Sequence, residues 1–409
     1  MKGYRRQFTR FALVAAAGAA LILSGCSKPP REAAGKLDTP DHHAVRGNDY
    51  LDRGDLDNAA RSFDMALSLD KNFSPALGGK AVTVALRSAA PGVKADQGRK
   101  LASQAEDLAT QARKRSKDDD ERRGALVAAL RVHRITKSPS NWLRESESVY
   151  KDAVKLDTRR LDADPHYFMA QAYRDAFDLQ RASDLYRDVL RMNRGRTQAA
   201  DSELAIVQKI LRAEPGSRHG KVVAFEAALG RADISALFVE ELQLGKLYER
   251  GNAARFDTGF RAPAQGGMQA DQLQRLPDVT DINDHPLRSD IQEVLRLKVA
   301  GLEPNADHKF YPDARITRAE FALMVEDVLV RVTGEQKLKT RFIGQNSPFP
   351  DVRSDAFFFN AVQTVVSRNL MEPKNKIQGI FGPQDPVSGA EALLVLRLLK
   401  DELRSLVRS

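Results

Sequence analysis

Apolar residues between positions 42 and 215 recur at the spacing of helix faces, and few segments alternate as a half-buried strand does. The clearest unit is "GNDYLDRGDLDNAARSFDMALSLDKN" at 47–72, and "AQAYRDAFDLQRASDLYRDVL" at 170–190 repeats its order of small and aromatic residues. Between these two units the pattern predicts four helices, at 76–90, 95–114, 120–135 and 141–155. The region is therefore predicted to form a series of helical hairpins.

The repeated spacing places small residues where two antiparallel helices cross, and aromatic residues where neighbouring hairpins meet. In the first unit these positions are Gly47, Tyr50, Ala59, Phe63 and Ala66, and in the second they are Ala170, Tyr173, Ala182, Tyr186 and Val189. This spacing resembles that of tetratricopeptide repeats, which implies a hairpin solenoid over residues 42–215 that binds a protein partner. A generic helical bundle is the alternative.

Three later segments share a short polar start that is followed by an apolar helix. They are "LGRADISALFVEELQL" at 229–244, "ITRAEFALMVEDVLVRV" at 316–332 and "VSGAEALLVLRLLKDEL" at 387–403. Thr317 with Glu320, and Ser388 with Glu391, have the spacing of a capping box, which predicts a helix start at each place. The apolar runs are broad, so we expect these helices to be buried on most sides.

A similar order of features precedes the second and third segments. Each has an Asp-Val turn (277–279 and 349–352), a helix (287–298 and 359–369), and a loop that closes on an aromatic residue and a proline. This layout resembles the S-layer homology (SLH) module over roughly residues 220–409. The resemblance implies an all-α pseudo-trimer with long loops, built from modules at about 216–250, 276–332 and 349–403. In that family the grooves between modules bind anionic cell-wall polysaccharide.

Carrying the family's motif over by position gives candidate glycan-binding residues. Two are the motif arginines, whose guanidinium matches a carboxylate in bidentate fashion. The full set is Arg231, Arg318, Asp278, Asp351 and Glu320. Three departures from the motif limit the site. Gly389 replaces the arginine in the third copy, His308 replaces the usual turn glycine, and the tryptophan position holds Pro286 or Phe357/Phe358. At most two grooves are therefore expected to be chemically complete, and a purely structural trimer is the alternative.

The N-terminus has the features of a secretory signal. Four basic residues precede the apolar run "FALVAAAGAALIL", which is short for a membrane span. The run leads into Leu23-Ser24-Gly25-Cys26, which resembles a bacterial lipobox and implies removal of residues 1–25 and lipidation, including palmitate, at Cys26. Residues 26–41 would then be a flexible tether. Ser27 rather than aspartate favours the outer membrane, with the face left open. A plain transmembrane anchor is the alternative.

Composition and charge exclude several classes of function. The formal net charge is +9, and removing the four positive residues of the signal leaves +5, which is weak for a nucleic-acid-binding protein. Cys26 is the only cysteine, so a disulfide framework and a cysteine-based zinc site are excluded. No motif with a catalytic mechanism is present, and we expect no enzyme activity, metal or cofactor.

The sequence therefore supports two hypotheses of different class. In the first, the protein is a non-catalytic lipoprotein of the cell envelope. It tethers a membrane to peptidoglycan or a linked anionic polysaccharide through residues 216–409, while the repeats bind a protein partner. In the second, the repeats are a scaffold that assembles a secretion or outer-membrane complex, and the SLH-like region is only structural.

Overall fold

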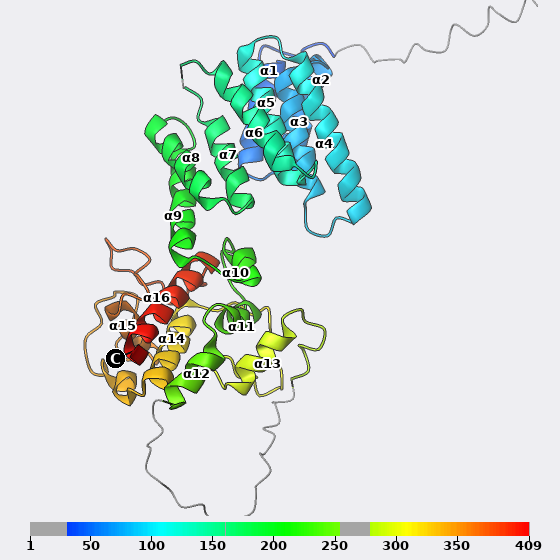
Figure 1. Cartoon of the computed structure of the whole chain (residues 1–409). Helices are drawn as coiled ribbons and strands as arrows, with labels where there is room; N and C mark the ends of the chain where they lie inside the picture. Colours follow the sequence, from blue (N-terminus) through cyan, green and yellow to red (C-terminus); the bar gives the residue numbers. More distant parts are fainter. Residues whose placement is uncertain (1–30, 160, 254–278, 409) are drawn as a thin grey trace, which may run out of the picture. The chain divides into compact units, whose positions relative to one another are not determined.

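The computed structural model describes residues 31–159, 161–253 and 279–408 (Figure 1). These residues form sixteen α-helices and one short 3-10 helix, and their only β contacts are isolated bridges, which confirms the predicted all-α fold. No helix in the described ranges has both the length and the apolar character needed to cross a membrane. The chain separates into two compact units between Arg160 and Leu161.

The first unit consists of three helical hairpins. They are α1 (Pro40–Asp52) with α2 (Leu56–Leu69), α3 (Ser74–Ser88) with α4 (Ala95–Arg115), and α5 (Asp119–Thr136) with α6 (Trp142–Leu156). The four helices expected from the apolar spacing begin and end within two residues of the observed bounds, so this prediction is confirmed. Helix α3 also packs on α2 and α5, which joins the hairpins into a stack.

The Phe63 ring fills the space where the first hairpin meets the second. Its side chain is fully buried, and a Cβ added to Gly47 or Gly79 would lie within 2.5 Å of the ring. Glycine is required at both positions because any side chain would displace the ring. Ala59 and Ala66 are likewise fully buried, so small residues occupy the close approaches between helices.

The second unit begins with a hairpin of α7 (Asp164–Asp175) and α8 (Leu179–Met192), and α9 (Thr197–Ala213) follows. Ala170, Ala182 and Tyr186 are fully buried in this part. Helix α9 packs on α8 and also on α16 (Gly389–Arg408), the last helix of the chain. The second unit thus includes residues on both sides of position 215, and the domain division at that residue stays a prediction.

The rest of the second unit contains three pairs of helices that follow one another along the chain. The first helices are α10 (Arg218–Val223), α13 (Arg288–Arg296) and α15 (Phe359–Ser367), and the second helices are α11 (Arg231–Glu240), α14 (Arg318–Thr333) and α16. Helix α12 (Leu244–Ala253) follows α11, and the 3-10 helix η1 (Gln336–Thr340) follows α14. Each first helix packs on the second helix of another pair, since α13 contacts α11, α15 contacts α14 and α10 contacts α16.

A closed ring of backbone hydrogen bonds joins the three pairs just before their second helices. The amide of Ile316 donates to the carbonyl oxygen of Leu229, the amide of Leu229 to Val387, and the amide of Val387 to Ile316, all at 3.0 Å. Because each residue donates to one neighbour and accepts from the other, the pairs are related by an approximate threefold axis. The three modules therefore form a pseudo-trimer within one chain, as predicted.

Candidate functional site

The start of each second helix is held by the segment that precedes another second helix. The amides of Arg318 and Ala319 donate to the carbonyls of Asp385 (2.9 Å) and Pro383 (3.0 Å). At the start of α11 the amides of Arg231 and Ala232 donate in the same way to the carbonyls of Ala314 (3.0 Å) and Pro312 (2.9 Å). At the start of α16 the Gly389 amide donates to the backbone carbonyl of Glu226 (2.9 Å). These first-turn amides have no partner within their own helix, so the neighbouring module caps them.

Each guanidinium nitrogen of Arg318 has a hydrogen-bond partner inside the protein. Its Nε donates to the carbonyl of Phe381 at 3.0 Å, Nη2 donates to the carbonyl of Glu372 at 2.7 Å, and Nη1 donates to the Glu391 carboxylate. The guanidinium lies 4.6 Å from the centroid of the Phe381 ring, and only 6% of the side chain is exposed. Arg318 therefore clamps the loop of the third module to α14.

Arg231 makes an equivalent clamp one module earlier. Its Nε donates to the carbonyl of Phe310 at 2.7 Å, and its two Nη atoms donate to the carbonyls of Gly301 and Glu303, each at 2.8 Å. The guanidinium again lies 4.6 Å from the ring of the phenylalanine that it contacts. Burial lowers the pKa of Arg231, and nearby carboxylates, Glu303 first, oppose that shift. A sugar contact stays a prediction for both arginines, but their geometry favours the structural alternative.

The third copy of the motif has glycine because its backbone lies against another module. A Cβ built on Gly389 would lie 1.7 Å from the carbonyl oxygen of Val223. No side chain fits there, so the arginine of the other two copies has no equivalent at this junction.

The aspartates of the turn motif also hold loops. The Asp351 carboxylate accepts hydrogen bonds from the amides of Phe381 (3.0 Å) and Gly382 (2.7 Å). In the second module Asp281 does the same for Phe310 (2.8 Å) and Tyr311 (2.7 Å). Asp278, the residue expected in this role, lies outside the described residues. The sequence reasoning missed Asp281, although "VTDI" at 279–282 matches "FPDV" at 349–352 in the place of its aspartate.

The two predicted capping boxes differ in the structure. Glu320 closes the first one, because its carboxylate accepts from the backbone amide of Thr317 at 2.8 Å and from the hydroxyl at 2.9 Å. Ser388 caps the amide of Glu391 at 3.3 Å, but the carboxylate of Glu391 accepts from Arg318. Glu320 is thus a helix cap in this structure, and its role as a glycan ligand stays a prediction.

A groove of about 690 Å³ lies where α9 faces α16 and the loop of the third module, and we refer to it as the α9–α16 groove. Its lining is partly apolar and includes Leu370, Leu394, Val395 and Leu398. Five basic and three acidic side chains also line it: Lys209, Arg212, Arg318, Lys374, Lys376, Glu372, Asp385 and Glu391. A cavity of this size that combines apolar surface with a few polar groups is typical of a ligand site.

Most of the charges in the groove are already paired. Lys374 Nζ lies 2.5 Å from a carboxylate oxygen of Asp385, and Lys376 Nζ lies 2.9 Å from one of Glu372. The pairing of Arg318 with Glu391 is the third. The modules themselves therefore contribute three ion pairs to the groove walls.

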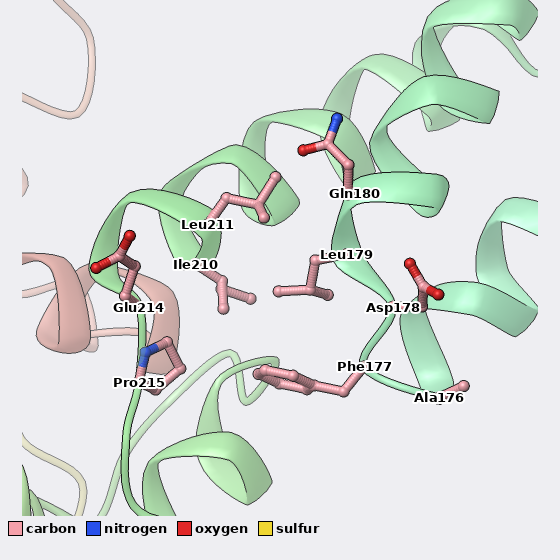
Figure 2. Close-up of a pocket in the computed structure, with 9 residues that line it drawn as sticks. All are labelled: Ala176, Phe177, Asp178, Leu179, Gln180, Ile210, Leu211, Glu214 and Pro215. Carbon is pink, nitrogen blue, oxygen red and sulfur yellow. The ribbon is translucent and has the colours of Figure 1, made fainter.

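A second hollow, of about 590 Å³, is formed by the turn between α7 and α8 and by the end of α9 (Figure 2). Phe177 in that turn adopts a left-handed φ of 60°, and Figure 2 shows its ring on the same side of the turn as Pro215. The only charged side chains that line this hollow are Asp178 and Glu214. It is therefore poorly suited to an anionic ligand, unlike the α9–α16 groove.

The S-layer homology domain family matches residues 348–393, which include α15 and the first turn of α16. The third module is thus similar to an SLH domain over these residues. No curated protein is significantly similar to the chain. The first and second modules are related to the third by the hydrogen-bond ring and the shared arginine clamps.

Proposed function

We propose that this protein is a non-catalytic lipoprotein that attaches a membrane to a cell-wall polymer. The observation that carries the proposal is the SLH match at residues 348–393, because the matched loop forms one wall of the α9–α16 groove. The groove combines apolar surface, which suits the faces of sugar rings, with charged groups that suit hydroxyls and acidic substituents.

The attachment to the membrane and the attachment to other molecules depend on different parts of the chain. Lipid on Cys26 holds the membrane end, and "LSGC" at 23–26 together with the lack of any other cysteine supports this. The hairpins form a repeat scaffold that binds a protein partner, and their small and aromatic packing positions support membership of the tetratricopeptide class. The outer membrane is the proposed location.

One observation favours a second candidate function. Arg231 and Arg318 are bound within the protein, so the modules can serve as a closed structural unit with no ligand at the motif arginines. In that case the protein is a scaffold for assembling an envelope complex, and the repeats carry its function.

Retention on purified peptidoglycan sacculi, with their linked polymers intact, separates the two functions. The full-length protein in detergent is expected to sediment with sacculi. A Leu398→Trp variant, which fills the groove from an exposed position, should stay in the supernatant. Ile343→Trp is the matched control, because Ile343 is 66% exposed and lies outside the groove. If the unaltered protein does not sediment but copurifies with a stable complex, the scaffold function is correct.

The membrane end is tested by Cys26→Ala. A lipid chain contributes about 0.8 kcal/mol of membrane affinity per buried CH₂, so its loss should release the processed protein from the membrane fraction. A processed variant that still fractionates with membranes would show that another segment is the anchor.

A further inference from the structure

The net positive charge of the α9–α16 groove comes from α9. Each basic side chain that the second and third modules contribute is paired with a carboxylate in the groove, namely Arg318 with Glu391, Lys374 with Asp385 and Lys376 with Glu372. The two remaining cations are Lys209 and Arg212. Within the described ranges neither of these side chains has an ion pair or a hydrogen bond.

The position of these two residues makes them a built feature of the groove. They are three residues apart on α9 and so lie on the same face of the helix. The buried residues Val207, Ile210 and Ala213 hold α9 in place, and α9 packs on α16. Lys209 is half-buried and Arg212 is exposed. Helix α9 lies outside the SLH match and belongs to the hairpin region of the sequence.

Two neighbouring cations without a counter-charge repel each other, and an anion placed between them removes that repulsion. A guanidinium binds a carboxylate or phosphate through two parallel hydrogen bonds, and an ammonium adds a point charge. The other charged side chains that line the groove are paired with one another, and part of the lining is apolar. Such a groove fits a saccharide that carries its anionic group on the side facing α9.

We propose that Lys209 and Arg212 form the anion-binding wall of the polymer site, and that they recognise a carboxylate or phosphate group on the wall saccharide. The inference rests on the proposed function, because it names the residues and the chemistry that bind within the same groove. Helix α9 is then part of the binding site, and the three SLH-like modules alone are not sufficient for binding.

The test compares full-length proteins in detergent for their affinity to sacculi over a range of salt concentrations. Lys209→Ala/Arg212→Ala should bind about tenfold more weakly or worse, since two charge-assisted contacts are lost. Its affinity should also depend less on salt than that of the unaltered protein. Arg194→Ala/Arg218→Ala is the matched control, because it removes the same charge from two exposed residues that do not line the groove. The control should bind like the parent.

The outcomes separate this inference from the proposed function. If the unaltered protein does not bind sacculi at all, the proposed function fails and the inference falls with it. If the unaltered protein binds and the double variant binds equally well with the same salt dependence, only the inference is overturned. Thermal denaturation should give the double variant the melting temperature of the parent, because neither side chain has a hydrogen bond or ion pair to another described residue.

Two treatments of the sacculi identify the source of the anion. If the anion is a carboxylate, amidation of carboxylates with a carbodiimide should abolish the difference in affinity for sacculi between the parent and the double variant. Treatment with hydrofluoric acid, which cleaves phosphodiesters, should abolish it if the anion is a phosphate. A difference that survives both treatments would show that the anion is not on the polymer, and would overturn the proposal.

Discussion

The guanidinium of Arg318 lies over the ring of Phe381, 4.6 Å from its centroid, while Nε donates to the carbonyl oxygen of the same residue at 3.0 Å. Arg231 and Phe310 repeat this relationship, with 4.6 Å to the ring and 2.7 Å to the carbonyl. Each arginine thus uses both the face of an aromatic ring and the backbone beside it to hold the loop of the next module. The motif recurs along the chain because the same junction between modules recurs.

Replacing Arg318 by alanine should destabilise the second unit by about 3–5 kcal/mol, since the change leaves Glu391 with an uncompensated charge in a protected place. Arg318→Lys should recover only part of this loss, because an ammonium cannot reproduce the fork. Urea denaturation measures the change in stability of both variants. Arg353→Ala is the control, because Arg353 pairs with Asp355 at the surface, where 83% of its side chain is exposed. A parent-like midpoint for Arg318→Ala would show that the clamp does not support the fold.

Gly389→Ala should destabilise the second unit by about 2 kcal/mol or more, because its Cβ would overlap the Val223 carbonyl and force the backbone apart. Gly124→Ala, by contrast, should increase the stability of the first unit. Gly124 is exposed within α5, nothing lies within 4 Å of its Cβ position, and alanine is the better helix former by about 1 kcal/mol. Calorimetry of the two variants is expected to give shifts in opposite directions. Equal shifts would contradict the close contact at Gly389.

The pH dependence of stability should change in Glu326→Gln. Burial raises the pKa of Glu326 above its ordinary value of 4.5, although its Oε1 accepts from Asn360 Nδ2 (2.5 Å) and Thr364 Oγ1 (3.2 Å). A raised pKa means that the folded state holds this proton more tightly than the unfolded chain does. The stabilisation is complete below pH 4.5 and is lost as pH rises through the folded pKa.

Glutamine keeps the accepting oxygen but carries no charge, so Glu326→Gln should be more stable than the parent at neutral pH. The difference should disappear on acidification towards pH 4.5. Denaturant titrations at several pH values measure both effects. A constant difference at every pH would show that folding does not raise the pKa of Glu326.

Ala182→Phe should destabilise the α7–α8 hairpin by about 1–3 kcal/mol, because Ala182 is fully buried and the extra ring would overpack the contact between the helices. Ala199→Phe makes the same change at an exposed position of α9 and should be nearly neutral. Circular dichroism during thermal denaturation compares the two. If both variants melt like the parent, Ala182 does not occupy a packing position.

Local patterns in the sequence were sufficient to predict the helices. Apolar spacing placed α3 to α6 within two residues, and the capping box of Thr317 with Glu320 placed the start of α14 correctly. These features depend on residues within one or two helical turns, where hydrogen bonding and the periodicity of burial are set by near neighbours. The order of turn, helix, loop and helix also allowed the pseudo-trimer to be predicted.

The partners of each side chain at the junctions were decided only by the tertiary structure. The contacts of Arg318 lie 54 to 73 positions further along the chain, so no local pattern could distinguish a clamp from a glycan ligand. For the same reason the sequence could not reveal that Gly389 lies against Val223. Nor could it place Lys209 and Arg212 beside the third module, because the packing of α9 on α16 joins residues almost 200 positions apart. Which charges in a groove are paired depends on the distances between side chains in space, and these distances are set only when the chain folds.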